Sequence, residues 1–515
     1  MTEPAPKHGA ILGQLLQQVG RVDFQILAFP EITGLRADLK EAQAKSTNPD
    51  GSANIDTPES MKAANEALQI QKQISSCRPT LKHYQVYGVQ HLLNLCKANQ
   101  WRLAAQHGRV YVYNGQHWQP IDENALKHFL GKAIEKMGVE HVHAEHFRFR
   151  EELVKQFHTT AHLPAPERDR SRVTVNLSNG TLSITPEGVQ LREFRAEDFL
   201  TYQLAFSYDP AAVAPIWQTF LDEVQPDKEA RQVLAEAAAT AFIPSSVLKL
   251  EKVPVLFGSG ANGKSVVADV LTAVLGRENV SGYSLKLLTQ NENARAGLQD
   301  KLLNISSEIG GIADSDVFKL LASGEPISAK RLYADLYTMR DYARLFCNAN
   351  ELPREVEHSP AFFRRFKILP FDVTIPAEQQ NTELSNQIKE TELPGVLNWI
   401  LEGLDRLLKQ RQFSHSRAAD KALQTYQHES NSVSLWLEDA SYTGSTNGHE
   451  QPFKTLYSEY RDFCKDEGFR PVSSKTFAQR MQAAGFEKQR KNTGFVYFVV
   501  KTFSAVEKGG SDAPF

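Results

Sequence analysis

The chain has 515 residues, with 58 basic and 61 acidic side chains, 41% apolar residues and four scattered cysteines. At roughly 150 residues per domain this length predicts about three domains, and the ordinary content of charged and aromatic residues excludes wholesale disorder. No apolar run approaches the roughly 18 residues of a membrane span, and the start, MTEPAPKHGA, lacks the hydrophobic core of a signal peptide. We therefore expect a cytoplasmic protein that is not associated with a membrane.

The first 215 residues predict two regions. Residues 1–80 read as a short helical segment that ends in a linker, because residues 47–60 are rich in turn formers. Residues 81–215 mix helices with short strands such as VYVYNG and VTVNLSNG, so we expect an α+β domain there. A helical collar is expected over residues 216–250.

Residues 216–378, including that collar, predict a nucleotide-binding α/β core, because apolar strands alternate with helices. The motif GSGANGKS fits the phosphate-binding loop G-x-x-x-x-G-K-S and lies between the strand VPVLF and the helix VVADVLTAVLG. Its residues are Gly258, Ser259, Gly260, Ala261, Asn262, Gly263, Lys264 and Ser265. We expect an exposed Lys264 to neutralise the phosphates of ATP and Ser265 to ligate Mg²⁺.

Polar residues follow or precede the next apolar strands. Glu308 ends LLNISSE at a strand that should neighbour the phosphate-loop strand, and it could polarise the attacking water and hold the magnesium shell. Asn350 follows ARLFCNA and could orient the water, although a turn-forming role explains it equally well. Arg364 and Arg365 precede FKILPF; they are either surface charge, or one of them reaches the phosphate of a neighbouring subunit.

Other polar clusters carry weaker signals. Lys330 and Arg331 lie in SGEPISAKRLY, whose glycine, proline and alternating pattern predict a hairpin that either contacts a phosphate backbone or is simply solvated. His141, His143 and His146 suggest a metal site, but we expect acidic and cysteine partners to be missing, which favours a solvated or structural role.

The carboxyl-terminal part carries the positive charge. Helices are expected over residues 379–440, followed by a polar linker. Residues 453–501 then hold ten basic and five acidic side chains, so this segment has a charge of +5 and the remainder −8. A basic module attached to an acidic body is typical of a chain that contacts nucleic acid.

The order of these motifs resembles that of superfamily 3 helicases, and more narrowly the phage and plasmid primase–helicase family related to the poxvirus primase–helicase. The series GSGANGKS, LLNISSE, SGEPISAKRLY, FCNANELP and FFRRFKILPF carries the resemblance. YVYNGQHW, VNLSNGTL, EDFLTYQL and YDPAAVAPIWQTFLDEV resemble the region before the motor, and ELPGVLNWILEGL the segment after it.

The resemblance implies an AAA+-like core in a ring-shaped, hexameric motor that uses ATP and Mg²⁺. It implies a helicase that moves 3′ to 5′ on one strand and unwinds forked DNA. This activity would serve the replication of a mobile element in a bacterial host. In this chain Lys264 and Ser265 would be the phosphate-loop pair and Asn350 the sensor. Lys330 and Arg331 would face DNA in the channel, and Arg365, or less surely Arg364, would be the arginine finger. Many relatives carry two adjacent acids where this chain has Ser307 and Glu308, which leaves open whether Glu308 is the base, a magnesium residue or both.

A winged helix is expected over residues 452–503, because two helical patterns precede a strand pair at residues 492–500. Its DNA contacts would be Lys475 and Arg480 on the second helix and Lys488, Arg490 and Lys491 at the wing. Fewer than about 100 residues precede the helicase-like region, below the usual size of a catalytic domain, so we expect no primase activity and a separate primase or host replication proteins as partners.

Two other functions fit the motifs. The chain could be an origin-binding initiator that uses ATP only to assemble on DNA, or an ATP switch that remodels a host protein. Strong stimulation of ATP hydrolysis by single-stranded DNA would distinguish the motor from both.

Overall fold

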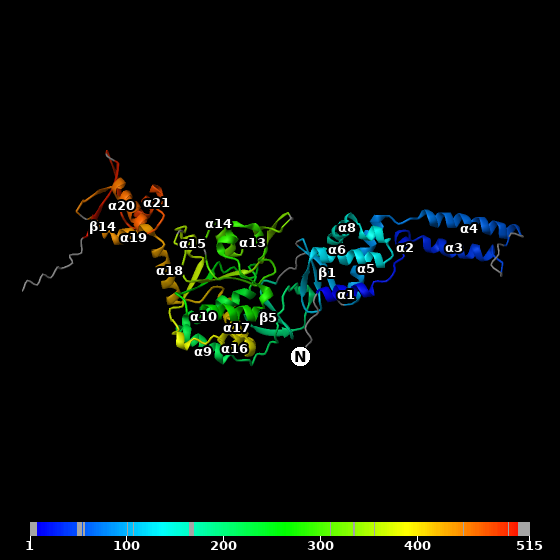
Figure 1. Cartoon of the computed structure of the whole chain (residues 1–515), viewed down its shortest axis with the longest axis horizontal. Helices are drawn as coiled ribbons and strands as arrows, with labels where there is room; N and C mark the ends of the chain where they lie inside the picture. Colours follow the sequence, from blue (N-terminus) through cyan, green and yellow to red (C-terminus); the bar gives the residue numbers. More distant parts are fainter. Residues whose placement is uncertain are drawn as a thin grey trace, which may run out of the picture. The chain divides into compact units, whose positions relative to one another are not determined.

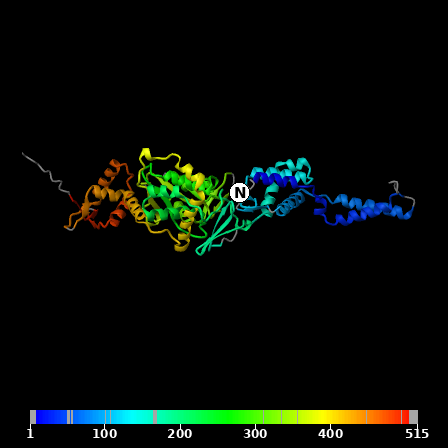
Figure 2. The same ribbon diagram turned by 90° about the horizontal axis from the view of Figure 1, so that it is seen from below.

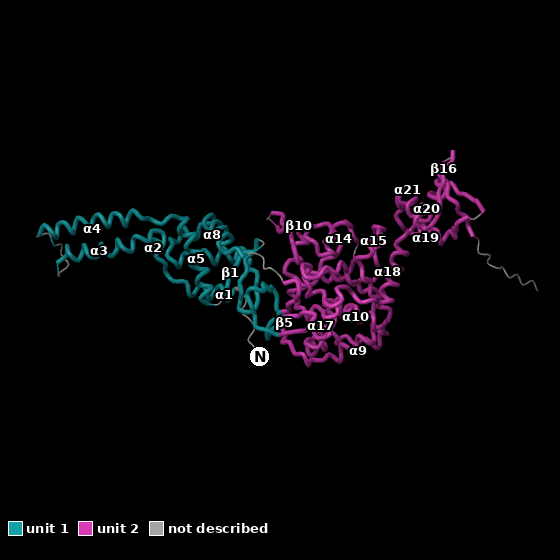
Figure 3. The backbone as a smooth tube through the Cα atoms, turned by 180° about the vertical axis from the view of Figure 1, so that it is seen from behind, with its two compact units in different colours: residues 1–168, 176–181, 191–203 teal, residues 169–175, 182–190, 204–515 magenta. Residues whose placement is uncertain are grey.

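The computed structural model describes residues 8–48, 54, 57–99, 101–106, 108–163, 169–309, 311–332, 335–354, 356–445, 447–492 and 494–502. The chain forms two compact units, coloured separately in Figure 3. Unit 1 comprises residues 1–168, 176–181 and 191–203, and unit 2 comprises residues 169–175, 182–190 and 204–515. Among the described helices, none has the length and apolar character needed to cross a membrane.

Unit 1 combines helices with an antiparallel sheet. Its helices are α1 (His8–Gln18), α2 (Phe24–Ala28), α3 (Ile32–Lys45), α4 (Pro58–Ser76), α5 (Leu81–Ala98), α6 (Glu123–Lys136), α7 (His141–Glu145) and α8 (Phe147–Thr160), and its sheet has the order β1 (Arg102–Gln106), β2 (Arg109–Tyr113) and β3 (Trp118–Ile121). Helices α3 and α4 lie side by side as a long pair (Figures 1 and 2). Ile11 and Leu15 of α1 are fully buried in the same core as α5, α6 and α8, so residues 8–18 are part of this unit's fold.

Three further strands, β4 (Val173–Leu177), β5 (Gly180–Thr185) and β6 (Gly188–Arg192), form a sheet whose residues are divided between the two units. Ser178 and Asn179 make the turn between β4 and β5, and Gly180 begins β5, so the turn lies one residue earlier than the Asn-Gly pair predicts.

Unit 2 is built on a five-stranded parallel sheet, which confirms the predicted α/β core. Its strands are β7 (Val253–Phe257), β8 (Val280–Ser281), β9 (Leu303–Ser306), β12 (Arg344–Ala349) and β13 (Phe366–Pro370), in the order β13-β7-β12-β9-β8. The helices around it are α9 (Pro215–Val224), α10 (Lys228–Ala239), α11 (Lys264–Leu275), α12 (Leu285–Gln290), α13 (Glu292–Ala296), α14 (Ser315–Ser323), α15 (Pro360–Phe363), α16 (Leu384–Thr391), α17 (Leu393–Gln410) and α18 (Arg417–Glu429). Helices α10 and α17 lie on one side of this sheet, and α13 and α14 lie on the other (Figures 1 and 3).

Helices α10 and α17 pack backbone against backbone. A Cβ added at Gly403 of α17 would lie 2.4 Å from the carbonyl carbon of Ala235 in α10. Beside this contact the fully buried carboxylate of Glu236 accepts hydrogen bonds from Arg406 Nε at 3.0 Å and from the Ser414 backbone N–H at 2.8 Å. A buried charge needs such partners, and here they join α10 to α17 and to the loop that follows α17.

The carboxyl-terminal module has its own core. It contains α19 (Ser432–Asp439), β14 (Tyr442–Gly444), β15 (Gln451–Pro452), α20 (Phe453–Asp466), α21 (Ser474–Ala483), β16 (Lys488–Lys491), β17 (Gly494–Tyr497) and β18 (Val499–Lys501). The strands form one sheet of order β15-β17-β16 and a β14-β18 pair. Val433 and Trp436 of α19 are buried in this core, so the module begins before residue 452.

Candidate nucleotide-binding site and nucleic-acid surfaces

The phosphate loop joins β7 to α11, as its motif predicts. Gly260 and Gly263 have φ angles of +113° and +83°, which glycine adopts without strain. A Cβ at Gly258 would lie 2.3 Å from Phe371 O, and one at Gly263 would lie 2.9 Å from the ring of Phe220. The glycines are therefore required by backbone conformation at two positions and by close packing at two.

Lys264 lies inside this loop. Its side chain is only 5% exposed, and its Nζ donates to Gly258 O at 2.7 Å and to Asn262 Oδ1 at 2.9 Å. Burial lowers the pKa of the Lys264 ammonium from its ordinary value. The expectation of an exposed lysine is therefore wrong, because the loop folds over the ammonium. Ser265, the next residue of α11, is exposed.

The segment after β13 holds the loop in place. Asn262 Nδ2 donates to Phe371 O at 2.9 Å, and the Ile375 N–H donates to Ala261 O at 2.8 Å. Because the loop is tied down on both sides, its backbone N–H groups keep a fixed direction, which a phosphate cradle needs.

The parallel strands β7, β12 and β9 end at the same edge of the sheet. Their carboxyl ends place three of the predicted residues along this edge, namely Gly258, Asn350 and Glu308. The Gly258 N–H donates to Ala349 O at 3.1 Å, which brings the exposed Asn350 beside the start of the loop. Glu308 is exposed two residues beyond β9. The expectation that its strand neighbours β7 is wrong, since β12 pairs with both β7 and β9 and separates them.

This set of groups suits a magnesium–nucleotide complex. The Ser265 hydroxyl and the Glu308 carboxylate supply the oxygen atoms that Mg²⁺ prefers, and Lys264 supplies a cation for phosphate oxygens. The glycines at positions 258 and 263 let the loop pack closely against Phe371 and Phe220.

Asn348 is a polar residue that the sequence motifs do not single out, and it lies on β12, the strand that Asn350 follows. Asn348 of β12 is in register with Leu256 of β7, and its Oδ1 is buried without a hydrogen-bond partner among the described residues. A buried amide oxygen of this kind is costly and often marks a functional position. Its signal in the sequence is a lone amide within the apolar strand RLFCNA.

The two candidate finger residues lie in opposite environments. Arg365 is 8% exposed, and its guanidinium donates to Lys319 O at 3.3 Å, to Ser323 Oγ at 3.3 Å and to Ala361 O. The Arg364 side chain is 60% exposed, with one distant ion pair of 3.6 Å to Glu251. Of the two, only Arg364 presents its guanidinium at the surface.

The predicted hairpin is confirmed. Strands β10 (Ile327–Lys330) and β11 (Leu336–Met339) pair antiparallel, with Lys330 opposite Leu336. Lys330 is exposed, whereas Arg331 is half-buried, stacks 4.8 Å over the Tyr337 ring and donates to Gln299 Oε1 at 2.6 Å. Leu332 is 73% exposed beside them, and Tyr333 of the motif lies outside the described residues.

The basic residues of the carboxyl-terminal module divide into two groups. Lys475 on α21 is exposed, and so are Lys488, Arg490 and Lys491, which lie on β16. Arg480 is half-buried and donates to Asn431 Oδ1 at 3.2 Å, so it packs towards α19. The hairpin of this module is β16 with β17, which starts earlier than the predicted strand pair at residues 492–500.

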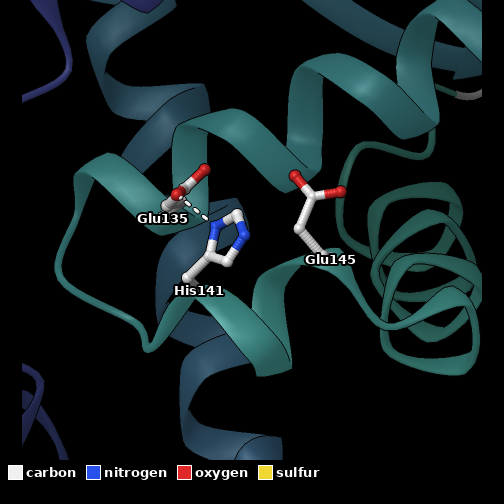
Figure 4. Close-up of side chains that lie close together, drawn as sticks. All are labelled: Glu135, His141 and Glu145. Carbon is white, nitrogen blue, oxygen red and sulfur yellow. Dashed lines mark hydrogen bonds and ion pairs between the residues drawn. The ribbon is translucent and has the colours of Figure 1, made fainter.

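Figure 4 shows a cluster of Glu135, His141 and Glu145 in unit 1, whose ligand atoms are close enough for one cation. Glu135 Oε1 lies 2.7 Å from His141 Nδ1, and Lys132 Nζ lies 3.0 Å from both Glu135 and Glu145. Arg150 pairs with Glu145 at 2.7 Å. Because two cations already balance these carboxylates, the cluster is explained as an ion-pair network.

Comparisons with known proteins find similarity along most of the chain. Three family models match successive segments: "D5 N terminal like" at residues 89–226, a family of unknown function (DUF5906) at residues 256–365, and "Poxvirus D5 protein-like" at residues 429–508. The "Putative helicase L207/L206" of Acanthamoeba polyphaga mimivirus is 27% identical over 35% of this chain and 19% of its own length. The "Putative helicase 121R" of Invertebrate iridescent virus 3 is 19% identical over 57% of this chain and 35% of its own length. This chain thus matches about a fifth and about a third of these two relatives.

Solved structures of the NrS-1 C-terminal region are also similar. One has a TM-score of 0.45 at 10% identity, covering 80% of this chain and 98% of that chain, and another has a TM-score of 0.46 at 12% identity, covering 81% and 99%.

A parallel sheet with a phosphate loop after one strand and polar residues at the same edge defines a P-loop nucleotide-binding protein. The matches before, across and after this core are more specific. The models that match before and after this core are those of D5-type proteins, and the two viral relatives are named putative helicases.

Proposed function

We propose that this chain is an ATP-dependent DNA helicase that works as a hexameric ring, moves 3′ to 5′ on one strand and serves the replication of a phage, plasmid or other mobile element. The observation that carries the proposal is the single sheet edge that holds the phosphate loop, Asn350 and Glu308, in a chain that also presents the basic hairpin β10–β11. A motor needs both parts, because hydrolysis at one must move the other.

Each residue has a distinct task in this proposal. Lys264 neutralises phosphate oxygens, and Glu308 accepts the proton of the attacking water. Asn350 orients that water, since its amide follows β12 directly beside the loop. Ser265 and Glu308 would hold magnesium, which would supply charge neutralisation for the phosphates. Arg364, which is exposed, acts on the site of the adjacent subunit.

The proposed DNA contacts lie on two elements. Lys330 and Arg331 face the strand inside the ring, with Arg331 held by Tyr337 and Gln299. The carboxyl-terminal module is a winged helix in this proposal, because α19 and the short strands β14 and β15 are followed by the helices α20 and α21 and then by β16 and β17, which would be the two-stranded wing. Lys475, Lys488, Arg490 and Lys491 are its exposed cations.

The test is ATP hydrolysis by the full chain with and without single-stranded DNA. We expect strong stimulation by DNA, and we expect Lys264→Ala to reduce both basal and stimulated hydrolysis to background. Because Lys264 is buried and hydrogen-bonded, a melting curve must accompany this variant, with Lys264→Met as a second variant that keeps the aliphatic stem.

Two outcomes would replace the motor by its alternatives. Nucleotide-dependent assembly on an origin duplex with negligible turnover would favour an initiator. Hydrolysis that a host protein stimulates and DNA does not would favour a remodelling switch.

A further inference from the structure

Unit 1 contains a groove of about 960 Å³ that neither the phosphate loop nor the basic module explains. Its walls come from the end of α5, from β1 and β3, from the residues after α8 and from residues 194–199, all within unit 1. The volume lies at the upper end of the range for small-molecule sites, so the groove can receive an extended ligand of a few linked groups.

The floor of the groove is a rigid aromatic cluster. Trp118 is fully buried, its Nε1 donates to Ala196 O at 2.8 Å, and its ring lies 5.0 Å from that of Phe199. Trp101 and Phe194 also line the groove and are only half-buried. Half-buried rings beside a preformed floor are suitable platforms for a flat ligand, because little side-chain freedom is lost on binding.

The rim is positively charged. Lys97, Arg102 and Arg195 line the groove and are exposed, and the His162 imidazole lies with them. Glu197 is the acid at this rim; it pairs with Arg102 at 2.7 Å, with both side chains more than half exposed. Arg195 lies close enough for its charge to lower the pKa of the Glu197 carboxyl, together with Arg102. Three cations and one acid leave this rim with a net charge of +2.

We infer that this groove binds single-stranded DNA, with bases stacked on Trp101 and Phe194 and phosphates held by Lys97, Arg102 and Arg195. Aromatic platforms beside a cationic track are how proteins bind single strands without reading their sequence. A duplex does not fit this chemistry, because its bases are already stacked on one another. The inference deepens the proposed function by adding a second contact with the strand, outside the motor unit.

The groove can be tested by measuring how the full chain binds a fluorescein-labelled oligo-dT of about 20 nucleotides. Binding is measured by fluorescence anisotropy in the absence of ATP. The double variant Lys97→Glu, Arg195→Glu should weaken binding at least tenfold and reduce the salt slope by roughly 1.4, since each lost single-strand phosphate contact contributes about 0.7. The matched control, Lys62→Glu with Lys72→Glu on α4, carries the same charge change in the same unit at exposed positions outside the groove.

A variant of opposite sign makes the test stricter. Glu197→Gln removes the acid at the rim and releases Arg102, so it should tighten oligo-dT binding several-fold at low salt and less at high salt. Trp101→Leu keeps an apolar side chain but no ring face, and should weaken binding roughly 5- to 100-fold. Melting temperatures of all variants check that unit 1 stays folded.

Three outcomes would overturn the inference: equal affinity of the groove double variant and the α4 control, no gain from Glu197→Gln, or an equal loss for a blunt duplex of the same length. These measurements need no ATP. They therefore test the groove even if the wild-type chain hydrolyses no ATP. A lack of hydrolysis would contradict the motor proposal but not the binding of single-stranded DNA in the groove.

Discussion

Arg364 and Arg365 show how much two adjacent residues can differ. The guanidinium of Arg365 donates to Lys319 O and Ser323 Oγ, and so links α14 to the start of β13, whereas the Arg364 side chain is directed into solvent. A residue that acts on a neighbouring subunit must reach the surface. We therefore propose Arg364 as the finger, in place of the Arg365 that the resemblance implies.

We predict that Arg364→Ala leaves the melting temperature unchanged, binds ATP and loses roughly 10³-fold or more in hydrolysis, as loss of an arginine finger does in related phosphoryl transfers. Arg365→Ala should instead lower the free energy of unfolding by about 1–3 kcal/mol, because it leaves buried acceptors without a donor. A mixture of Arg364→Ala and Lys264→Ala subunits should regain some ATP hydrolysis. In such a mixture the Arg364→Ala subunit supplies an intact phosphate loop and the Lys264→Ala subunit supplies an intact finger. Normal hydrolysis by Arg364→Ala would contradict this assignment.

At the scale of elements, the contact between α10 and α17 depends on glycine. Gly403 has no room for a Cβ because the Ala235 carbonyl occupies that space, whereas Gly34 of α3 has nothing within 4 Å. We predict that Gly403→Ala destabilises unit 2 by about 1–3 kcal/mol through overpacking. Gly34→Ala, the same change in an exposed helix, should stabilise by about 0.5–1 kcal/mol through helix propensity. Urea unfolding of both variants checks the opposite signs.

A second element-scale prediction concerns the joint between α15 and α18. His358 Nε2 donates to Ser430 O at 2.7 Å, and burial, with a smaller effect of the Arg480 charge, lowers the pKa of His358 to about 4. An unfolded histidine has a pKa of about 6.5, so between pH 6.5 and 4 the unfolded chain binds a proton that the folded joint does not. The stability contributed by His358 is therefore present above this window and lost as the pH falls through it.

The variant His358→Gln isolates this effect, because its amide can donate to Ser430 O without titrating. The melting temperature of the wild type should fall more steeply from pH 7 to pH 5 than that of the variant. His117 in unit 1, whose pKa burial also lowers to about 4, titrates in both proteins and cancels in the comparison. Parallel curves would show that His358 does not couple folding to pH.

Local signals predicted the elements better than the contacts between them. The strand VPVLF, the phosphate loop and the helix after it are where the motif places them, because glycine conformation and apolar runs act within a few residues. The burial of Lys264, the different partners of Arg364 and Arg365, and the position of β12 between β7 and β9 depend on residues distant in the chain. Periodicity also predicts α19 as a helix but cannot show that Trp436 packs into the carboxyl-terminal core.

At the scale of the whole molecule, the +5 module should dominate duplex binding. Truncation before residue 452 would remove the partners of the buried Trp436, so substitution is the cleaner test. We predict that Lys488→Glu, Arg490→Glu, Lys491→Glu weakens duplex binding and lowers its salt slope by about 0.9 for each lost phosphate contact. The control Lys454→Glu, Arg461→Glu, Lys465→Glu makes the same charge change at exposed positions on α20. Equal salt slopes for the two triple variants would remove β16 from the DNA contacts.

The strand order of unit 2 also determines when this unit can fold. Strand β7 pairs with β12 and β13, and residues 344–349 and 366–370 are made long after it. Until they emerge from the ribosome, the apolar strand VPVLF has two unpaired edges, and such non-local pairing is slow to form and prone to aggregation. Chains that end between α11 and β12 should therefore accumulate as insoluble protein, whereas chains that extend past Phe371 can close the sheet around β7.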